Sequence, residues 1–367
     1  MMVNRRFAWF SLVTLVYTVG VVLWGAFVRA TGSGAGCGDH WPLCNGEVIP
    51  REASMQTLIE YSHRLTSGVA MLLVLAMVIW AVRAYPKRHR TRRGAFWVGV
   101  FMLLEAAIGA GLVLFEYVAF NVSIARAYWM AAHLLNTFIL LGIMTLTTWW
   151  AFGKPGFRLR PWEPTGVWLS VSIVGTLLVG VSGAIAALGD TLTITGGISP
   201  EESVIVATLI GLRVYHPLMA VITGVIICIA AYRVYSRSAV PLARSLARVL
   251  TSLFLVQLAL GYINILLMAP VWMQITHLLV SDIIWILLLI TTAAVLADRR
   301  VLTPQGSMGT GSTSSAVQVP QSGDGLPAPD AQQQPHGYEH AQHGEAPPEP
   351  LGVDLVAHPH PEPSHRD

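Results

Sequence analysis

Charged residues are scarce in this sequence, and Lys, Arg, Asp and Glu together make up only 12% of it. Soluble globular proteins carry about twice that share, so the composition argues against that class. With 54% hydrophobic residues, the chain has the composition of an integral membrane protein. Nothing indicates nucleic-acid binding, because the few basic residues are spread over several loops. Zinc binding is also disfavoured, because only His40 accompanies the nearby cysteine pair.

The segment 301–367 lacks both long apolar runs and basic residues. Its single arginine, Arg366, stands against eight acidic residues, and it holds eleven of the 21 prolines and six of the twelve histidines. Such segments cannot bury enough apolar surface to fold. We therefore expect 301–367 to be a disordered, acidic, Pro/His-rich cytoplasmic tail, for which metal binding is only a weak alternative.

Long apolar runs dominate the rest of the chain. Crossing a membrane takes about 20 apolar residues. Eight runs qualify, at 8–28, 58–82, 95–116, 128–150, 166–188, 213–235, 249–268 and 272–296. The first run lacks a small-residue cleavage site before Arg29, so it is interpreted as a retained helix rather than a signal peptide. The prediction is an all-α integral membrane protein with eight transmembrane helices.

The loops between these runs differ in basic residues. The N-terminal segment, the loops after the second, fourth and sixth runs, and the segment after the eighth hold 17 Lys and Arg residues. The other loops hold only Arg29, Arg51 and Arg126. Because basic loops stay in the cytoplasm, we expect a multi-pass protein of the cell membrane with both termini cytoplasmic.

Four histidines lie inside the apolar runs: His63, His133, His216 and His277. Each follows the start of its run by one to two turns, and the alternation of loops places all four near the outer face. Ionisable groups inside a membrane are costly, and imidazole is a common ligand of haem iron. A hydrogen bond between helices is the structural alternative for any single histidine. Four at matched depth favour ligation.

The chain resembles a tandem repeat. His63 and His216 are 153 residues apart, and His133 and His277 are 144 apart. Glu105 corresponds to Gln257, and each is followed four residues later by glycine. An even number of spans in each half predicts a parallel repeat of two pseudo-symmetric four-helix bundles, 1–152 and 153–300. Each bundle supplies two histidines, which is the number that a bis-histidine haem requires.

The two halves differ beside the first histidine of each pair. Glu60 lies three residues before His63, whereas Arg213 lies three residues before His216. An arginine there suits a haem propionate. A carboxylate would repel one, which favours a role in proton transfer or in stabilising positive charge. An intrahelical Glu60–Arg64 pair is the structural alternative, and Arg64 is a further candidate for a propionate.

Cys37 and Cys44 lie in the loop between the first two runs, on the oxidising side of the predicted membrane. A structural disulfide is the default interpretation, and a redox-active pair is the functional alternative. Cys228 lies within the sixth run and is interpreted as a packing residue.

These motifs together resemble the haem A synthase family, in the subset with a paired-cysteine outer loop. The resemblance covers residues 1 to about 300. It rests on three segments: Gly25-Ala-Phe-Val-Arg29-Ala-Thr-Gly-Ser-Gly34, Cys37-Gly-Asp-His-Trp-Pro-Leu-Cys44-Asn-Gly46 and Glu60-Tyr-Ser-His63-Arg64. Glu105 departs from the pattern, which has a neutral amide there. Neither Glu105 nor Asp282 receives a role.

The resemblance implies an enzyme that oxidises a methyl group of haem O to a formyl group, which yields haem A for terminal oxidases. Hydroxylated intermediates and water as the oxygen source are expected. Glu60, His63 and His133 would take the substrate haem, and His216 and His277 a resident haem b. Haem O synthase (protohaem farnesyltransferase), a quinone or other electron acceptor, and membrane lipid are the expected partners. The alternative is a di-haem b electron carrier resembling cytochrome b, without substrate chemistry.

Overall fold

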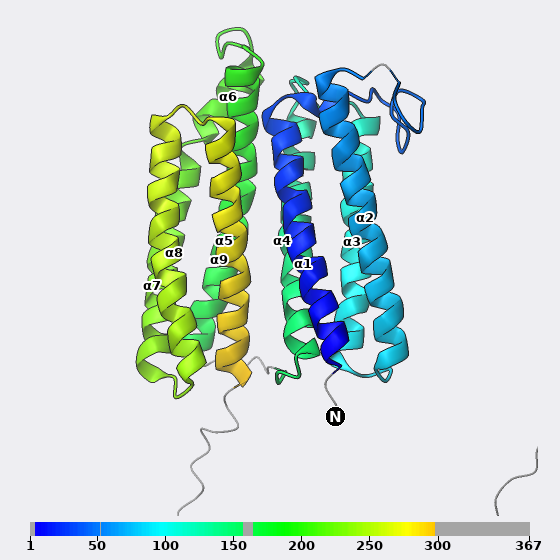
Figure 1. Ribbon diagram of the computed structural model, residues 1–367. Helices are drawn as coiled ribbons and strands as arrows, with labels where there is room; N and C mark the ends of the chain where they lie inside the picture. Colours follow the sequence, from blue (N-terminus) through cyan, green and yellow to red (C-terminus); the bar gives the residue numbers. More distant parts are fainter. Residues whose placement is uncertain (1–3, 52, 157–163, 298–367) are drawn as a thin grey trace, which may run out of the picture. The chain divides into compact units, whose positions relative to one another are not determined.

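The computed structural model describes residues 4–51, 53–156 and 164–297, and the predicted tail at 301–367 lies outside them. The described residues form α-helices without any β-strand, as Figure 1 shows. The helices are α1 (Arg5–Ala30), α2 (Met55–Ala84), α3 (Arg90–Leu114), α4 (Ile124–Ala151), α5 (Pro164–Asp190), α6 (Val204–Leu212), α7 (Tyr215–Arg237), α8 (Pro241–Leu266) and α9 (Val271–Ala297). A short 3₁₀ turn spans Ser33–Ala35, and a π-helical segment, Thr191–Thr195, continues α5.

Eight helical segments among the described residues are long and apolar enough to cross a membrane. This confirms the predicted all-α membrane class. The sixth segment runs over Val204–Arg237 and so begins earlier than the predicted 213, because α6 precedes α7. Pro217 explains the break between them: proline has no N–H, and its ring clashes with the carbonyl four residues before. That carbonyl belongs to Arg213, where α6 has just ended.

Side-chain caps mark where the histidine-bearing helices α2 and α4 begin. Ser54 accepts a hydrogen bond from the backbone N–H of Thr57, and Ser123 accepts one from that of Arg126. Each serine satisfies one of the N–H groups that a helix start leaves unpaired, a contribution of about 1 kcal/mol. The caps fix the first turns of the helices, and thereby the depth at which His63 and His133 lie.

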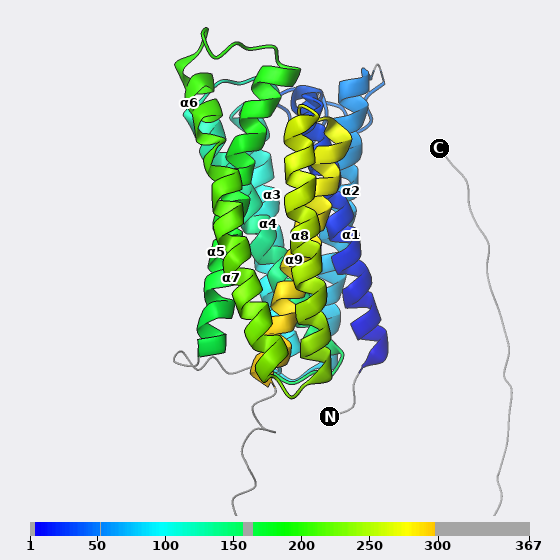
Figure 2. The ribbon, with the colours of Figure 1, turned by 90° about the vertical axis from the view of Figure 1, so that its left-hand side faces the viewer.

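Helices α1 to α4 contact one another in sequence order, with α1 closing back on α4. Helices α5, α7, α8 and α9 contact one another in the same way. Figure 2, turned by 90°, shows the same near-parallel arrangement. Helix α4 also packs on α5 and α9, and the indole N–H of Trp285 donates to the carbonyl of Phe138 at 2.7 Å. The two groups of helices thus share one core, and the division into bundles with one site each stays a prediction.

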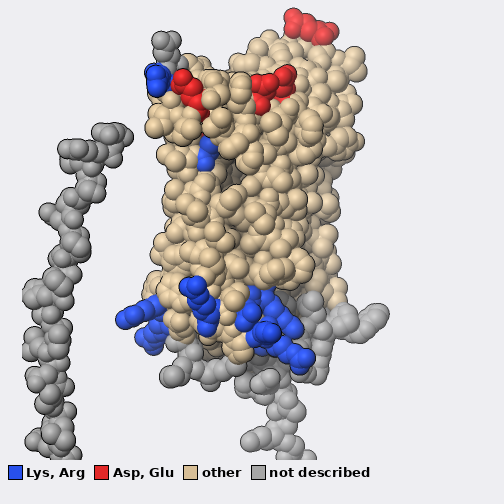
Figure 3. Space-filling model, turned by 90° about the vertical axis from the view of Figure 1, so that its right-hand side faces the viewer, with Lys and Arg blue, Asp and Glu red and all other residues tan. Residues whose placement is uncertain are grey.

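Charge is separated along the helices. On the face drawn in Figure 3, most Lys and Arg gather at the end where the chain begins, whereas Asp and Glu lie at the opposite end with fewer basic side chains. We refer to the first as the basic end. It includes Arg83, Arg92, Arg233 and Arg237, in or beside the last turns of α2 and α7 and the first turn of α3.

Candidate functional site

All four candidate histidines lie toward the end of the molecule opposite the basic end, which we call the histidine end. They are carried by α2, α4, α7 and α9, each of which starts at that end. His63 and His133 lie within about three turns of the starts of α2 and α4, and His277 lies within two turns of the start of α9. His216 lies in the first turn of α7, after the additional turns of α6.

Each imidazole packs against a glycine of a neighbouring helix. A methyl group at the glycine would lie 2.9 Å from the His63 ring, 3.8 Å from that of His133, 3.0 Å from that of His216 and 3.2 Å from that of His277. The glycines are Gly25 of α1, Gly109 of α3, Gly183 of α5 and Gly261 of α8. The glycines, which have no side chain, thus make room for all four rings. At His63, His216 and His277, a larger residue in place of the glycine would displace the ring.

The imidazoles of His216 and His277 lie next to each other edge to face, with ring centroids 6.3 Å apart and planes at 76°. Imidazole nitrogens bind metals at about 2 Å, so two rings on opposite sides of one metal have centroids roughly 6 Å apart. Nδ1 of His216 lies 3.2 Å from both the carbonyl of Val179 and the hydroxyl of Ser182. A histidine ligand commonly uses one nitrogen in this way and binds with the other. The pair therefore fits haem ligation.

His63 and His133 lie within electrostatic range of each other. Nδ1 of each ring is buried and has no hydrogen-bond partner. A carboxylate oxygen of Glu105 lies 3.3 Å from Nδ1 of His133, without the geometry of a hydrogen bond. Glu105 itself accepts hydrogen bonds from Asn136 and Thr137. Buried ring nitrogens without a hydrogen-bond partner fit a ligand-binding pair.

Glu105 and Gln257 occupy equivalent places, as their spacing in the sequence suggested. The amide nitrogen of Gln257 lies 3.2 Å from Nε2 of His277 and donates to Ser281 at 2.7 Å. Each residue thus contacts the second histidine of its half. The halves differ in charge at this point, because one histidine neighbours a carboxylate and the other a neutral amide.

Glu60 forms an ion pair with Arg64, which the sequence left as the structural alternative. One carboxylate oxygen of Glu60 accepts from Nε of Arg64 at 3.1 Å, and the other accepts from the backbone N–H of Cys37 at 2.8 Å. Nη1 of Arg64 donates to the carbonyls of His40 and Leu43. The pair therefore holds the outer loop on α2, and Glu60 is only 3% exposed.

A disulfide joins Cys37 to Cys44 within that loop. Cys228, in α7, is a free cysteine. Arg213 is also engaged, because its Nη1 donates to a carboxylate oxygen of Asp190 at 2.9 Å while about half of its side chain stays exposed. The sequence pattern offered Glu60 as a partner of Arg64, but it did not reveal the loop carbonyls that also bind Arg64 or the pairing of Arg213 with Asp190.

Sequence reasoning missed a further arginine at this end. Arg29, counted as a loop residue and quoted in the family motif without a role, donates through Nη1 to the carbonyl of Ala187 and the hydroxyl of Thr191, and through Nη2 to the side-chain oxygen of Gln274. It therefore joins α1 to α5, the π-helical segment and α9. Its place in the family motif at the end of an apolar run was a signal, but its partners lie far away in sequence and could not be read from it.

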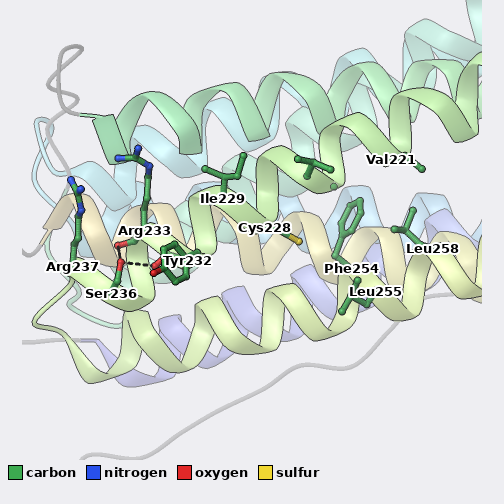
Figure 4. Close-up of a pocket in the computed structure, with 12 residues that line it drawn as sticks. Val221, Cys228, Ile229, Tyr232, Arg233, Ser236, Arg237, Phe254, Leu255 and Leu258 are labelled. Carbon is green, nitrogen blue, oxygen red and sulfur yellow. Dashed lines mark hydrogen bonds between the residues drawn. The ribbon is translucent and has the colours of Figure 1, made fainter.

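A cavity of about 710 Å³ lies elsewhere. Figure 4 shows it between α7 and α8, where apolar side chains line its length and Arg233 and Arg237 lie together at its basic end. None of the four histidines lines this cavity. The described residues contain no group of three or more His, Cys, Asp or Glu placed to hold a metal ion. Haem iron needs only one or two protein ligands, which the histidine pairs can supply.

Comparison with known proteins connects this geometry to a family. The family model described as "Cytochrome oxidase assembly protein" matches residues 8–289. A protein of Thermus thermophilus named protoheme IX farnesyltransferase is 46% identical over 311 residues, or 82% of this chain and 50% of the relative. The chain thus spans about half the length of that relative.

Two shorter matches carry another name. A heme A synthase of Exiguobacterium sibiricum is 42% identical over 113 residues, 31% of this chain and 38% of the relative. A heme A synthase of Bacillus mycoides is 44% identical over 110 residues, 30% of this chain and 35% of the relative. Because the family model covers most of its length, the chain belongs to the COX15-CtaA family of cytochrome oxidase assembly proteins.

Proposed function

We propose that this protein is a haem A synthase, which oxidises a methyl group of haem O to a formyl group. The observation that carries the proposal is the set of four glycine-backed imidazoles at one end of the helices, in two pairs. Family membership and the names of the shorter matches support it. In this proposal His63 and His133 take the substrate, and His216 and His277 hold a resident haem b.

The resident haem would supply an electron outlet, and the protein's own contribution is to hold and orient it. His216 is suited to this because Val179 and Ser182 fix one ring nitrogen and leave the other to bind. His277 is positioned by Gln257, which also donates to its backbone carbonyl at 3.0 Å. These contacts limit ring rotation, which preorganises both ligands.

The overall reaction takes the methyl group and one water to the formyl group, four electrons and four protons. A first two-electron oxidation with addition of water gives the hydroxymethyl compound. A second gives a geminal diol, which loses water to leave the aldehyde. Removing electrons from a methyl group on a conjugated ring develops positive charge at that carbon. A quinone or another acceptor of that class must receive the electrons.

Glu60 is suited to stabilise that charge. Its carboxylate is held by the side chain of Arg64 and by the backbone of Cys37, so it forms a fixed negative group one turn from His63. Preorganised charge stabilises a transition state without reorganisation during the reaction. A carboxylate fixed at both oxygens is less suited to swing as a proton carrier, so we assign Glu60 the electrostatic role.

We further propose that the basic end is cytoplasmic and the histidine end faces outward. The gathering of Lys and Arg at one end supports this orientation. The haem O substrate then comes from a farnesylating enzyme in the same membrane. The length relation to the Thermus thermophilus relative supports a physical association, because half of that protein lies beyond the match to this chain.

The test is co-expression of the protein with a haem O source, followed by extraction and mass identification of the haems. Wild type should yield haem A, whereas alanine at His63 or His133 should leave haem O, with haem b retained. Alanine at His216 or His277 should remove haem b. A wild-type protein that returns only haem b, with no haem A, would be an electron carrier, and the proposal would fail.

A further inference from the structure

Two arginines lie within electrostatic range of each other at the histidine end; Arg126 is buried and Arg29 is partly exposed. Arg29 is in the last turn of α1 and Arg126 is in the first turn of α4, close enough for their guanidinium groups to repel each other. Arg126 is only 2% exposed. Its Nη1 donates to the carbonyl of Asn121 at 3.0 Å, but its Nε is buried and has no hydrogen-bond partner.

This cluster carries more positive than negative charge. Neither Arg29 nor Arg126 forms a salt bridge with a described carboxylate. Asp190, the acid within electrostatic range of Arg29, already pairs with Arg213. The start of α4 adds the positive end of a helix dipole. Burying unpaired charge is costly unless a partner neutralises it, so the site calls for an anion.

Arg29 is fixed in place before any anion binds. Its guanidinium donates to three acceptors, on α5, on the π-helical segment and on α9. Departures from α-helical geometry of this kind recur at functional sites, and here the π-helical segment provides the Thr191 hydroxyl that Arg29 contacts. A guanidinium held this way loses little conformational freedom when it binds a ligand.

Arg126 and Arg29 lie near His133 and His63 along the helices. Arg126 lies seven residues before His133, which places both on one face of α4 about 10 Å apart along its axis. Arg29 lies one turn beyond Gly25, which backs His63. An anion bound at Arg126 would therefore lie between the imidazoles of His63 and His133 and the histidine end of the molecule.

We infer that Arg29 and Arg126 form an anion site that takes a propionate carboxylate of the haem bound at His63 and His133. The inference rests on the proposed function. The propionates are the only charged groups at the edge of a haem, and an arginine fork binds a carboxylate through two parallel hydrogen bonds. Arg64, by contrast, is saturated by Glu60 and two loop carbonyls.

The experiment titrates the purified full-length protein, which retains its resident haem, with added haem b and with haem b dimethyl ester. The ester keeps the macrocycle and iron but has no free carboxylates. Binding is followed by the Soret band in wild type, Arg126→Gln, Arg126→Lys and the control Arg51→Gln. Arg51 is an exposed residue on a loop at the same end, so the control removes the same charge.

Wild type and Arg51→Gln should bind haem b at least ten-fold more tightly than the ester. Arg126→Gln should lose about ten-fold in haem affinity and bind the ester unchanged. Arg126→Lys should retain part of the preference, since it keeps the charge without the fork, and it replaces the glutamine variant if that variant does not fold.

An unchanged ratio of haem to ester affinity in both Arg126 variants would overturn the inference. The inference would also fail if the Arg126 variants kept the wild-type ratio of haem to ester affinity but lost an acidic phospholipid that co-purifies with wild type. The anion at the two arginines would then be a lipid headgroup and not a haem propionate. If wild type binds neither the added haem b nor its ester beyond its resident haem, the proposed function fails. That result differs from failure of the anion-site inference, in which wild type still binds both.

Discussion

Glu60 and Arg64 lie one helical turn apart on α2, and their side chains form an ion pair that holds the disulfide loop through its backbone. Glu60 accepts from the N–H of Cys37, while Arg64 donates to the carbonyls of His40 and Leu43. The proposed catalytic carboxylate therefore also anchors the segment that covers it. Substitutions here must separate a chemical effect from a loosened loop.

Glu60→Gln is expected to keep haem binding but lower haem A yield at least ten-fold, with haem O or the hydroxymethyl intermediate accumulating. Glutamine keeps a hydrogen-bond acceptor for Cys37 and loses the negative charge that stabilises the developing cation. Mass identification of extracted haems measures this. Glu47→Gln, at an exposed position of the same loop, should leave the yield unchanged. Normal haem A from Glu60→Gln would remove Glu60 from the mechanism.

Gly25→Ala is expected to lower haem binding at the His63 pair, because the added methyl group would lie 2.9 Å from the ring and displace it. Gly20→Ala provides the control on the same helix, since nothing lies within 4 Å of a methyl group there. Alanine in that open position should stabilise α1 by up to about 1 kcal/mol. Haem content per protein should fall in Gly25→Ala only, and the unfolding temperature should rise in Gly20→Ala. Equal haem content in both variants would contradict the packing argument.

Exchanging Glu105 for Gln and Gln257 for Glu is expected to shift the reduction potentials of the two proposed haems in opposite directions. A carboxylate near an imidazole ligand stabilises the oxidised, more positive iron. Glu105→Gln should therefore raise the potential of the haem at His133, and Gln257→Glu should lower that of the haem at His277. Spectroelectrochemical titration follows both. A shift of the same sign in both variants would show that structural disturbance, and not charge, controls the potential.

Acid is expected to weaken the loop between α2 and α3 through His89. Its Nδ1 accepts from the N–H of Thr91, its ring stacks on Tyr85, and partial burial together with Arg90 lowers its pKa below 6.5. A depressed pKa means that the folded state binds fewer protons. The stabilisation is therefore complete above pH 6.5 and is lost as the pH falls through the folded pKa.

The pH dependence can be checked by thermal unfolding in detergent between pH 7.5 and 5. His89→Asn keeps a capping side chain that does not titrate. The drop in unfolding temperature on acidification should be smaller in this variant than in wild type. An identical drop in both proteins would exclude His89 as the titrating group.

The spans and the clustering of the histidines were predictable because both follow from local patterns. Apolar runs of sufficient length define helices in a membrane, and the alternation of loops places His63, His133, His216 and His277 toward one end. The equivalence of Glu105 and Gln257 followed from repeat spacing in the same way. Each of these inferences depends on residues close together along the chain or at a constant offset.

The partners of the arginines were not predictable, because they depend on packing between distant helices. Arg213 was expected beside a propionate, yet it pairs with Asp190 on another helix. Arg29 and Arg126 were counted as loop residues and given no role, although they lie in the last turn of α1 and the first turn of α4. Helix α6 was missed because the sixth run was started at 213, whereas the span begins at Val204 and the interruption before Pro217 divides it into α6 and α7.

The three hydrogen bonds of Arg29 also constrain how the protein can be made. Its donors belong to the first span, whereas the acceptor on Gln274 belongs to the last. During synthesis, the hydrogen bond between Arg29 and Gln274 cannot form until the last span has been inserted. The two similar halves are therefore not independent modules: an N-terminal fragment ending after its fourth span would leave the guanidinium of Arg29 without its acceptors on α5, the π-helical segment and α9.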